Sequence, residues 1–127
     1  MLFDLDPYGY FHFHIYFKNE EEEKRAMTLS KQLIELFGGE YNKPVNKPIG
    51  PHPYPMVEVD IGKNMTAGQR REKFATAVMF CMNHGNGLSV LIHAMGEGVD
   101  ALSAHTKEAL WVGPQLDLNL NAFKGHN

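Results

Sequence analysis

The chain has 127 residues, a length that suits one domain, and we expect residues 1–127 to form a single domain. Hydrophobic residues make up 43% and charged residues 21%, as in ordinary globular proteins, and the formal net charge of -3 argues against a nucleic-acid or anionic-membrane partner. The single cysteine, Cys81, excludes an internal disulfide and a cysteine-based zinc site. No apolar run approaches the ~20 residues of a membrane helix and the first residues lack a signal-peptide pattern, so a cytoplasmic location is expected.

Residues 10–17 are aromatic or β-branched, which predicts a strand. Side chains alternate across a strand, so the two faces differ in chemistry. One face carries Phe11, Phe13, Ile15 and Phe17, and the other carries Tyr10, His12, His14 and Tyr16.

A helix is predicted over residues 20–37, because Asn19 is a suitable N-cap, four acids follow it, and Gly38-Gly39 stops the pattern. Residues 40–55 hold five prolines, which predicts an irregular edge strand that runs into a turn. Strict alternation over residues 56–61 then predicts a second clear strand.

A capping box at Thr66–Gln69 begins a second amphipathic helix, which the glycines at 85 and 87 end. Residues 88–94 form a predicted strand that places His93 opposite its apolar face. Residues 98–112 are predicted to hold a short helix ending near Trp111, and weak alternation over 115–120 is compatible with a further strand.

The predicted order β-α-β-β-α-β indicates an α+β fold, the ferredoxin-like split βαβ sandwich, with an antiparallel sheet and two helices on one face. The other face would stay open. Such a face, rich in tyrosine and leucine, is usually covered by a second subunit, so a homodimer is expected. The side chains expected to gather on it are His12, His14, Glu58, Asp60 and His93.

Seven histidines are the unusual feature of the composition. His84 at a helix end and His126 in the tail look incidental. His12-x-His14 places two imidazoles on one side of a strand, roughly 6.6 Å apart, and imidazole suits iron, zinc, copper or nickel. The alternative interpretation is a pair of half-buried sheet residues.

His52 lies between two prolines, which restrict its backbone and fix where its ring points, although a plain exposed turn has the same pattern. His93 ends a strand, where ligands often gather. His105 and Glu58 also have ordinary structural interpretations, as a helix-terminal residue and a solvent-facing carboxylate.

Four motifs follow one another along the chain: aromatic-His-x-His-Ile-Tyr-Phe at 11–17, Pro-x-Gly-Pro-His-Pro at 48–53, Gly-Leu-x-x-Leu-x-His at 87–93, and His-Thr-x-x-Ala-Leu-Trp-x-Gly at 105–113. In this order they resemble the DOPA 4,5-dioxygenase family over about residues 10–118. The resemblance implies a ferredoxin-like fold, a dimer, and O2-dependent ring opening of a catechol next to one hydroxyl. The residues that match the family motifs are His12, His14, His52, His93, His105 and Trp111.

One departure from that family is Ala104, where many members carry an acid before the matching histidine. If that acid orients the imidazole, its support is missing here, which puts activity on DOPA itself in question.

The primary hypothesis is an extradiol dioxygenase for a catechol such as DOPA, with Fe(II) as cofactor, or another divalent metal in a purified sample. The expected metal ligands are His14 and His93, with His12 and His52 close behind, and Glu58 is the best-placed carboxylate. His52 and His105 are the expected acid/base residues near neutral pH.

Two other hypotheses stay open at this stage. One is a non-catalytic dimeric ferredoxin-like module that binds a small aromatic ligand or a metal. The other is a cofactor-free enzyme in which a histidine acts as base on a small aromatic substrate. Metal content and catechol turnover distinguish the three.

Overall fold

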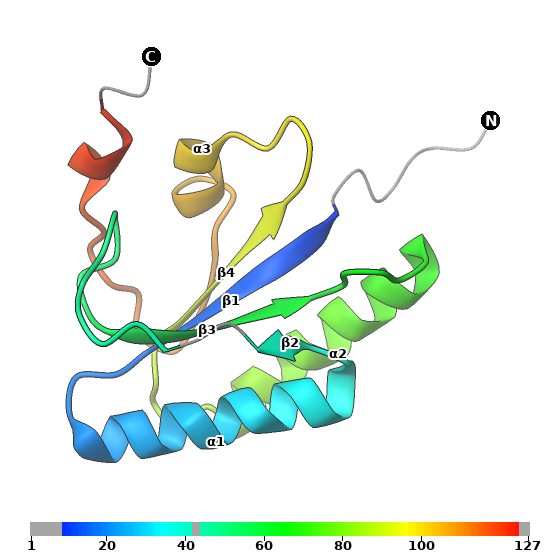
Figure 1. Ribbon diagram of the computed structural model, residues 1–127, viewed down its shortest axis with the longest axis horizontal. Coiled ribbons are helices and arrows are strands. Elements are labelled where there is room, and N and C mark those ends of the chain that lie inside the picture. Colours follow the sequence, from blue (N-terminus) through cyan, green and yellow to red (C-terminus); the bar gives the residue numbers. More distant parts are fainter. Residues whose placement is uncertain (1–8, 42–43, 125–127) are drawn as a thin grey trace.

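The computed structural model describes residues 9–41 and 44–124 and consists of one five-stranded antiparallel sheet with two long helices on one face (Figure 1). The strand order is β2-β3-β1-β4-β5, so the first strand is central. This arrangement confirms the predicted ferredoxin-like α+β fold, to which β5 adds one edge strand. The strands are β1 (Tyr10–Tyr16), β2 (Glu40–Tyr41), β3 (Met56–Ile61), β4 (Val90–Met95) and β5 (Leu110–Val112).

The two long helices have the boundaries that their caps predict. Helix α1 (Glu20–Phe37) begins after Asn19, whose side chain accepts a hydrogen bond from the Glu22 amide, and it ends at Gly38 with a left-handed φ of 68°. Helix α2 (Ala67–His84) begins with a complete capping box between Thr66 and Gln69.

Both helices pack on the apolar face of the sheet. Residues from β1, β3 and β4 are sealed there with residues from the two helices. The side chain of Cys81, on α2, belongs to this core, and burial raises the pKa of its thiol to about 12. The largest fully buried core side chains include Phe13, Ile15, Leu29, Leu33, Ile61 and Ile92.

The segment after β4 differs from its prediction. The expected helix over 98–112 is only α3 (Ala101–His105), capped by Asp100, and Leu110–Val112 pairs with β4 as β5. Gly113 explains why the chain can turn there: its φ is 75°, and a Cβ at this position would collide with the carbonyl oxygen of Leu88. Pairing with β4 gives the backbone groups of Leu110–Val112 their hydrogen bonds, which explains why these residues extend the sheet and not the helix.

The strand considered for residues 115–120 is also wrong. A short 3-10 helix, η1 (Leu120–Phe123), ends this segment, and the preceding residues form no strand. The amide of Asn119 donates to the carbonyl oxygen of Pro51 at 2.8 Å, so the segment lies against the proline-rich loop instead of a strand edge.

The face opposite the long helices is not open, contrary to the prediction. The proline-rich loop, α3 and the C-terminal segment lie on that side of the sheet (Figure 1). His14 is 2% exposed and His93 is 3% exposed as a result. His126 lies outside the described residues. None of the described helices is long and apolar enough to cross a bilayer.

Candidate active site

A cavity of about 350 Å³ lies above the polar face of the sheet. The antiparallel register of β1 explains why histidines gather at its floor, because His12 is directly opposite both Asp60 and His93, and His14 is opposite Glu58. The polar residues that line it are His12, His14, His52, Glu58, His93 and His105.

Three histidines form the deepest part of this site. Single nitrogen atoms of His14, His93 and His105 all lie within 4.8 Å of one another, which is a spacing that can hold a metal ion. The Nε2 atoms of His14 and His93 are 2.9 Å apart. The ring centroids of His93 and His105 are 4.2 Å apart.

The second nitrogen of each of these three rings faces an acceptor. Nδ1 of His93 donates to the carbonyl oxygen of Ala94 at 3.1 Å, and Nδ1 of His105 donates to that of Ala101 at 2.7 Å. Nδ1 of His14 lies 3.2 Å from the sulfur of Met56 and 3.4 Å from Oε1 of Glu58. With the proton on Nδ1, each ring keeps the lone pair on Nε2.

This proton arrangement makes the close pair of nitrogens informative. Two Nε2 lone pairs at 2.9 Å repel each other unless a proton or a metal ion lies between them, and the acceptors at the Nδ1 atoms favour the metal ion. Two nitrogens that bind one ion at about 2.1 Å are about 3 Å apart when the angle between them is near 90°. The donor set therefore fits a metal ion.

Burial keeps these imidazoles in the neutral form that metal binding requires. Burial, together with the neighbouring His52 and His93, holds the pKa of His14 well below its usual value. Burial and the nearby His105 lower the pKa of His93 to about 3, against the opposing effect of the backbone hydrogen bond to Ala94. Burial also lowers the pKa of His105.

His12 belongs to a separate carboxylate cluster at the same cavity. Its Nδ1 lies 2.5 Å from Oδ1 of Asp60 and 3.6 Å from Oε1 of Glu58. Nζ of Lys63 binds the other oxygen of Asp60 at 2.9 Å. Burial alone would raise the pKa of Asp60, but the hydrogen bonds from His12 and Lys63 outweigh burial and lower it, so this carboxyl group is ionised.

His52 enters the cavity from the proline-rich loop. Its Nδ1 lies 2.7 Å from the hydroxyl of Tyr16, which is buried and whose pKa is raised by that burial. The ring of Tyr16 stacks on Trp111 of β5 at a centroid distance of 6.0 Å. Burial, and secondarily the nearby His105, lower the pKa of His52 to about 4.

Comparison with known proteins agrees with this site. The model of the Dopa 4,5-dioxygenase family matches residues 11–122, a range that contains the whole histidine cluster. The chain belongs to the Dopa 4,5-dioxygenase family.

Two relatives of this family member extend the match. A crystal structure described as a "putative dioxygenase" from Nostoc punctiforme superimposes with a TM-score of 0.80 at 29% identity, over 95% of this chain and 96% of that chain. A protein of Botryotinia fuckeliana, described as an uncharacterized 21.2 kDa protein, is 32% identical over 124 residues. That match covers 91% of this chain and 64% of the length of the fungal protein. The family and the solved structure agree with dioxygenase chemistry.

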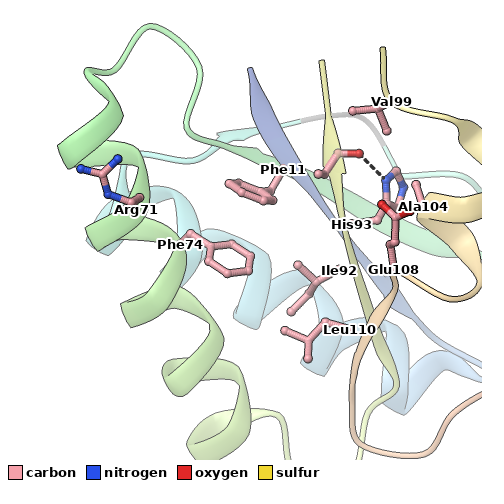
Figure 2. A pocket seen from close by; sticks show the side chains of 10 residues that line it. Phe11, Arg71, Phe74, Ile92, His93, Val99, Ala104, Glu108 and Leu110 are labelled. Atoms are coloured by element: carbon pink, nitrogen blue, oxygen red, sulfur yellow. Dashed lines mark hydrogen bonds between the residues drawn. The ribbon is translucent and has the colours of Figure 1, made fainter. Parts of the chain in front are cut away.

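A second hollow, of about 310 Å³, lies on the other side of β4 (Figure 2). Figure 2 shows Phe11 and Phe74 side by side between α2 and the sheet, with their rings stacked at 4.2 Å, whereas His93 points away from them. The two hollows share His93, Val99 and Ala104 among their lining residues, so they lie next to each other.

The structure brings all six predicted site residues to one cavity but divides them differently from the prediction. His105, expected as an acid/base residue, lies with His14 and His93. His12 and Glu58, expected as metal ligands, lie with Asp60 in the neighbouring cluster.

Two further residues, Asp60 and Tyr16, were placed on this face from the sequence but were given no role in the site. Asp60 shares a face with His12 by simple alternation, so the strand pattern already placed it near the site. Tyr16 follows the same alternation as His12 and His14, and this was the available signal. Their hydrogen-bond partners, in contrast, depend on the packing of the loop and the sheet.

Proposed function

We propose that this protein is an extradiol ring-cleaving dioxygenase that acts on a catechol such as DOPA and uses O2 and Fe(II). The observation that carries the proposal is the convergence of His14, His93 and His105, whose Nδ1 atoms face acceptors and whose Nε2 atoms are left for a metal ion. We propose these three histidines as the ligands, in place of the set that included His12 and Glu58.

The proposed ligand set differs from the common set of two histidines and one carboxylate in non-haem iron oxygenases. Glu58 contacts Nδ1 of His14, so its role is to orient that ring. When bound, iron would supply the electron-transfer and Lewis-acid centre that lets a catecholate react with O2. Another divalent metal could occupy the same nitrogen donors in a purified sample.

His12 is the proposed proton acceptor. Asp60 accepts its Nδ1–H, so the second nitrogen of the ring carries a lone pair toward the cavity. A catechol hydroxyl must lose its proton to become a strong ligand and electron donor. The Asp60–His12 pair can take that proton, and Lys63 keeps Asp60 ionised while the imidazole becomes charged.

His52 is the proposed hydrogen-bond donor on the other side of the site, in place of the acid/base role expected from the sequence. The centroid of its ring lies 4.4 Å from that of His14 and 5.6 Å from that of His105, so His52 lies beside two of the proposed metal ligands. The prolines on both sides fix the position of the ring, which favours one pose of the substrate.

The size and walls of the cavity support a small aromatic substrate. Its volume of about 350 Å³ is at the lower end of ordinary ligand sites. Apolar side chains complete the walls around the histidine floor. These residues are Ile49, Met56, Met95, Val99 and Phe123.

The direct test is anaerobic loading of the purified protein with Fe(II), followed by a panel of catechols in air. We expect uptake of one iron per chain and formation of a yellow ring-cleavage product from at least one catechol, with consumption of one O2 per ring opened. A variant that replaces His84, which lies at the end of α2 away from the cavity, is the matched control and should behave like the wild type.

Two outcomes would replace this proposal. A tightly bound metal without turnover of any catechol would favour a non-catalytic binding module for an aromatic ligand or a metal. Turnover that persists in the presence of a chelator would favour a cofactor-free enzyme in which a histidine such as His12 acts as the base.

We also propose a homodimer, as the family resemblance implies. Light scattering at micromolar concentration should give about twice the mass of 14.4 kDa. A stable monomer under these conditions would contradict the proposal, and it would leave the metal site unaffected because its ligands come from one chain.

A further inference from the structure

The hydroxyl of Tyr16 is the only polar group of a side chain that is otherwise sealed in an apolar cluster. Tyr16 is 1% exposed and packs with Met56 and Leu91, and its ring is stacked on Trp111. Within the described residues, the partner of the hydroxyl is Nδ1 of His52, at 2.7 Å. A sealed hydroxyl that loses its acceptor is costly, so the direction of this hydrogen bond is constrained.

The constraint decides which atom carries the proton. If Nδ1 of His52 held a proton, it would donate to the oxygen of Tyr16, and the hydroxyl proton of Tyr16 would have no acceptor among the described residues. If the hydroxyl donates to Nδ1, both groups are satisfied. A neutral His52 whose Nδ1 accepts must hold its own proton on Nε2.

We infer that Tyr16 is a positioning residue that fixes His52 as the Nε2–H tautomer, so that His52 donates a hydrogen bond into the cavity and does not bind the metal. An imidazole nitrogen that carries a proton has no lone pair for an ion. The catalytic consequence rests on the proposed dioxygenase function, whereas the tautomer follows from the contacts alone.

The other four cavity histidines provide the contrast. Nδ1 of His12 faces a carboxylate, and those of His93 and His105 face backbone carbonyls, which only accept. Nδ1 of His14 faces a sulfur and a carboxylate oxygen. His52 alone among the five has Nδ1 opposite a hydroxyl whose proton needs an acceptor.

The Nε2 atom of His52 is accessible to a ligand. It has no hydrogen-bond partner among the described residues. It is also not sealed from solvent, because among these residues the only sealed side-chain nitrogen or oxygen that lacks a hydrogen bond is Nε of Arg25. His52 also lines the cavity. A group that binds Nε2–H must accept a hydrogen bond, so the matching part of the substrate is a ring oxygen, most favourably a deprotonated one.

The backbone supports the same fixed donor. The amide of His52 donates to the carbonyl oxygen of Ile49 at 2.9 Å, which closes a turn, and Pro51 and Pro53 restrict the chain on both sides. With backbone, ring orientation and tautomer all set, the Nε2–H group needs no rearrangement when substrate arrives.

The test combines spectroscopy and kinetics. In protein labelled with ¹⁵N-histidine and loaded with diamagnetic Zn(II), nitrogen chemical shifts at pH 7.5 should show His52 as the Nε2–H tautomer, and a His52→Asn variant identifies its signal. In Tyr16→Phe the tautomer should change or become mixed. Tyr54→Phe is the matched control, because Tyr54 packs against the same cluster without a hydrogen bond to His52.

The kinetic arm uses the iron-loaded protein. Tyr16→Phe should keep its metal content and lose about 10- to 100-fold in kcat for a catechol that the wild type cleaves, the scale for loss of an orienting partner. The double variant Tyr16→Phe/His52→Ala should have a kcat only slightly lower than that of His52→Ala alone, because both changes remove the same function.

The outcomes separate this inference from the proposed function. An Nδ1–H tautomer of His52 in the wild type would overturn the inference, and so would loss of metal in Tyr16→Phe. Absence of turnover in the wild type, with the Nε2–H tautomer intact, would refute the dioxygenase and still support the assignment of Tyr16 and His52.

Discussion

The two faces of β1 are covered to a similar degree but by different means. Phe13 and Ile15 face two regular helices, and burial of their apolar surface stabilises the fold. His12 and His14 face a proline-rich loop, a five-residue helix and a short 3-10 helix. The comparison shows that regular elements cover the face that needs only burial, whereas irregular segments cover the face that needs precise polar partners.

Adjacent residues on β4 extend this comparison, because Ile92 points to the helix layer and His93 points to the cavity. Replacement of His93 by alanine should have the largest effect. Loss of one proposed ligand should reduce iron affinity by more than the roughly 100-fold that loss of an orienting partner costs, and should abolish turnover. The iron content that remains after desalting measures this loss of affinity.

The control for His93→Ala is His84→Ala, a histidine at the end of α2. Equal iron content in the two variants would exclude His93 as a ligand. Full iron content with lost turnover would instead place His93 among the acid/base residues.

Ile92→Ala tests the opposite face with a change one residue away. We expect a loss of about 2–4 kcal/mol in the free energy of unfolding, because a fully buried side chain is truncated beside an existing hollow. Urea denaturation of the metal-free protein measures this loss. The folded fraction should still bind one iron per chain, and a lost metal site would show that the two faces are not independent.

The last effect depends on pH and concerns the metal-free protein. The pKa of His52 is lowered from 6.5 to about 4 and that of His93 to about 3, so the unfolded chain binds protons at a pH where the folded chain does not. Above pH 6.5 neither state is protonated and these groups have no effect. As pH falls below 6.5, each should cost about 1.4 kcal/mol of stability per pH unit until its folded pKa is reached.

Urea titrations between pH 7.5 and pH 5 would show this slope. A His52→Asn variant should lose the contribution of one group, so its stability should fall less steeply with acid. Identical slopes in the two proteins would mean that the pKa of His52 is the same in the folded and the unfolded chain, which would contradict the lowered value.

Sequence alone was sufficient for the regular half of the molecule. Alternation in β1 and β3 assigned both faces, and the caps at Asn19 and Thr66 located the two long helices. These signals are local, since they depend on residues within a few positions of one another.

The covering segments were harder to predict because their structure depends on distant partners. The conformation of residues 98–123 depends on pairing with β4, on the hydrogen bond to the loop at Pro51 and on the close approach at Gly113. The spacing of apolar residues within the segment does not reveal these contacts. The division of roles among the histidines has the same origin. The sequence does not show that Nδ1 of His105 faces a carbonyl oxygen whereas Nδ1 of His12 faces Asp60, and these partners separate the two roles.

The buried thiol of Cys81 can report how often the helix layer opens. Because it is the single cysteine and its pKa is about 12, alkylating reagents can modify it only when α2 moves away from the sheet. The rate of thiol labelling therefore measures how often α2 separates from the sheet, and it can be measured without an enzyme assay. If iron stabilises the native state, labelling should slow as iron is added, which would reveal how strongly the two layers of the molecule are coupled.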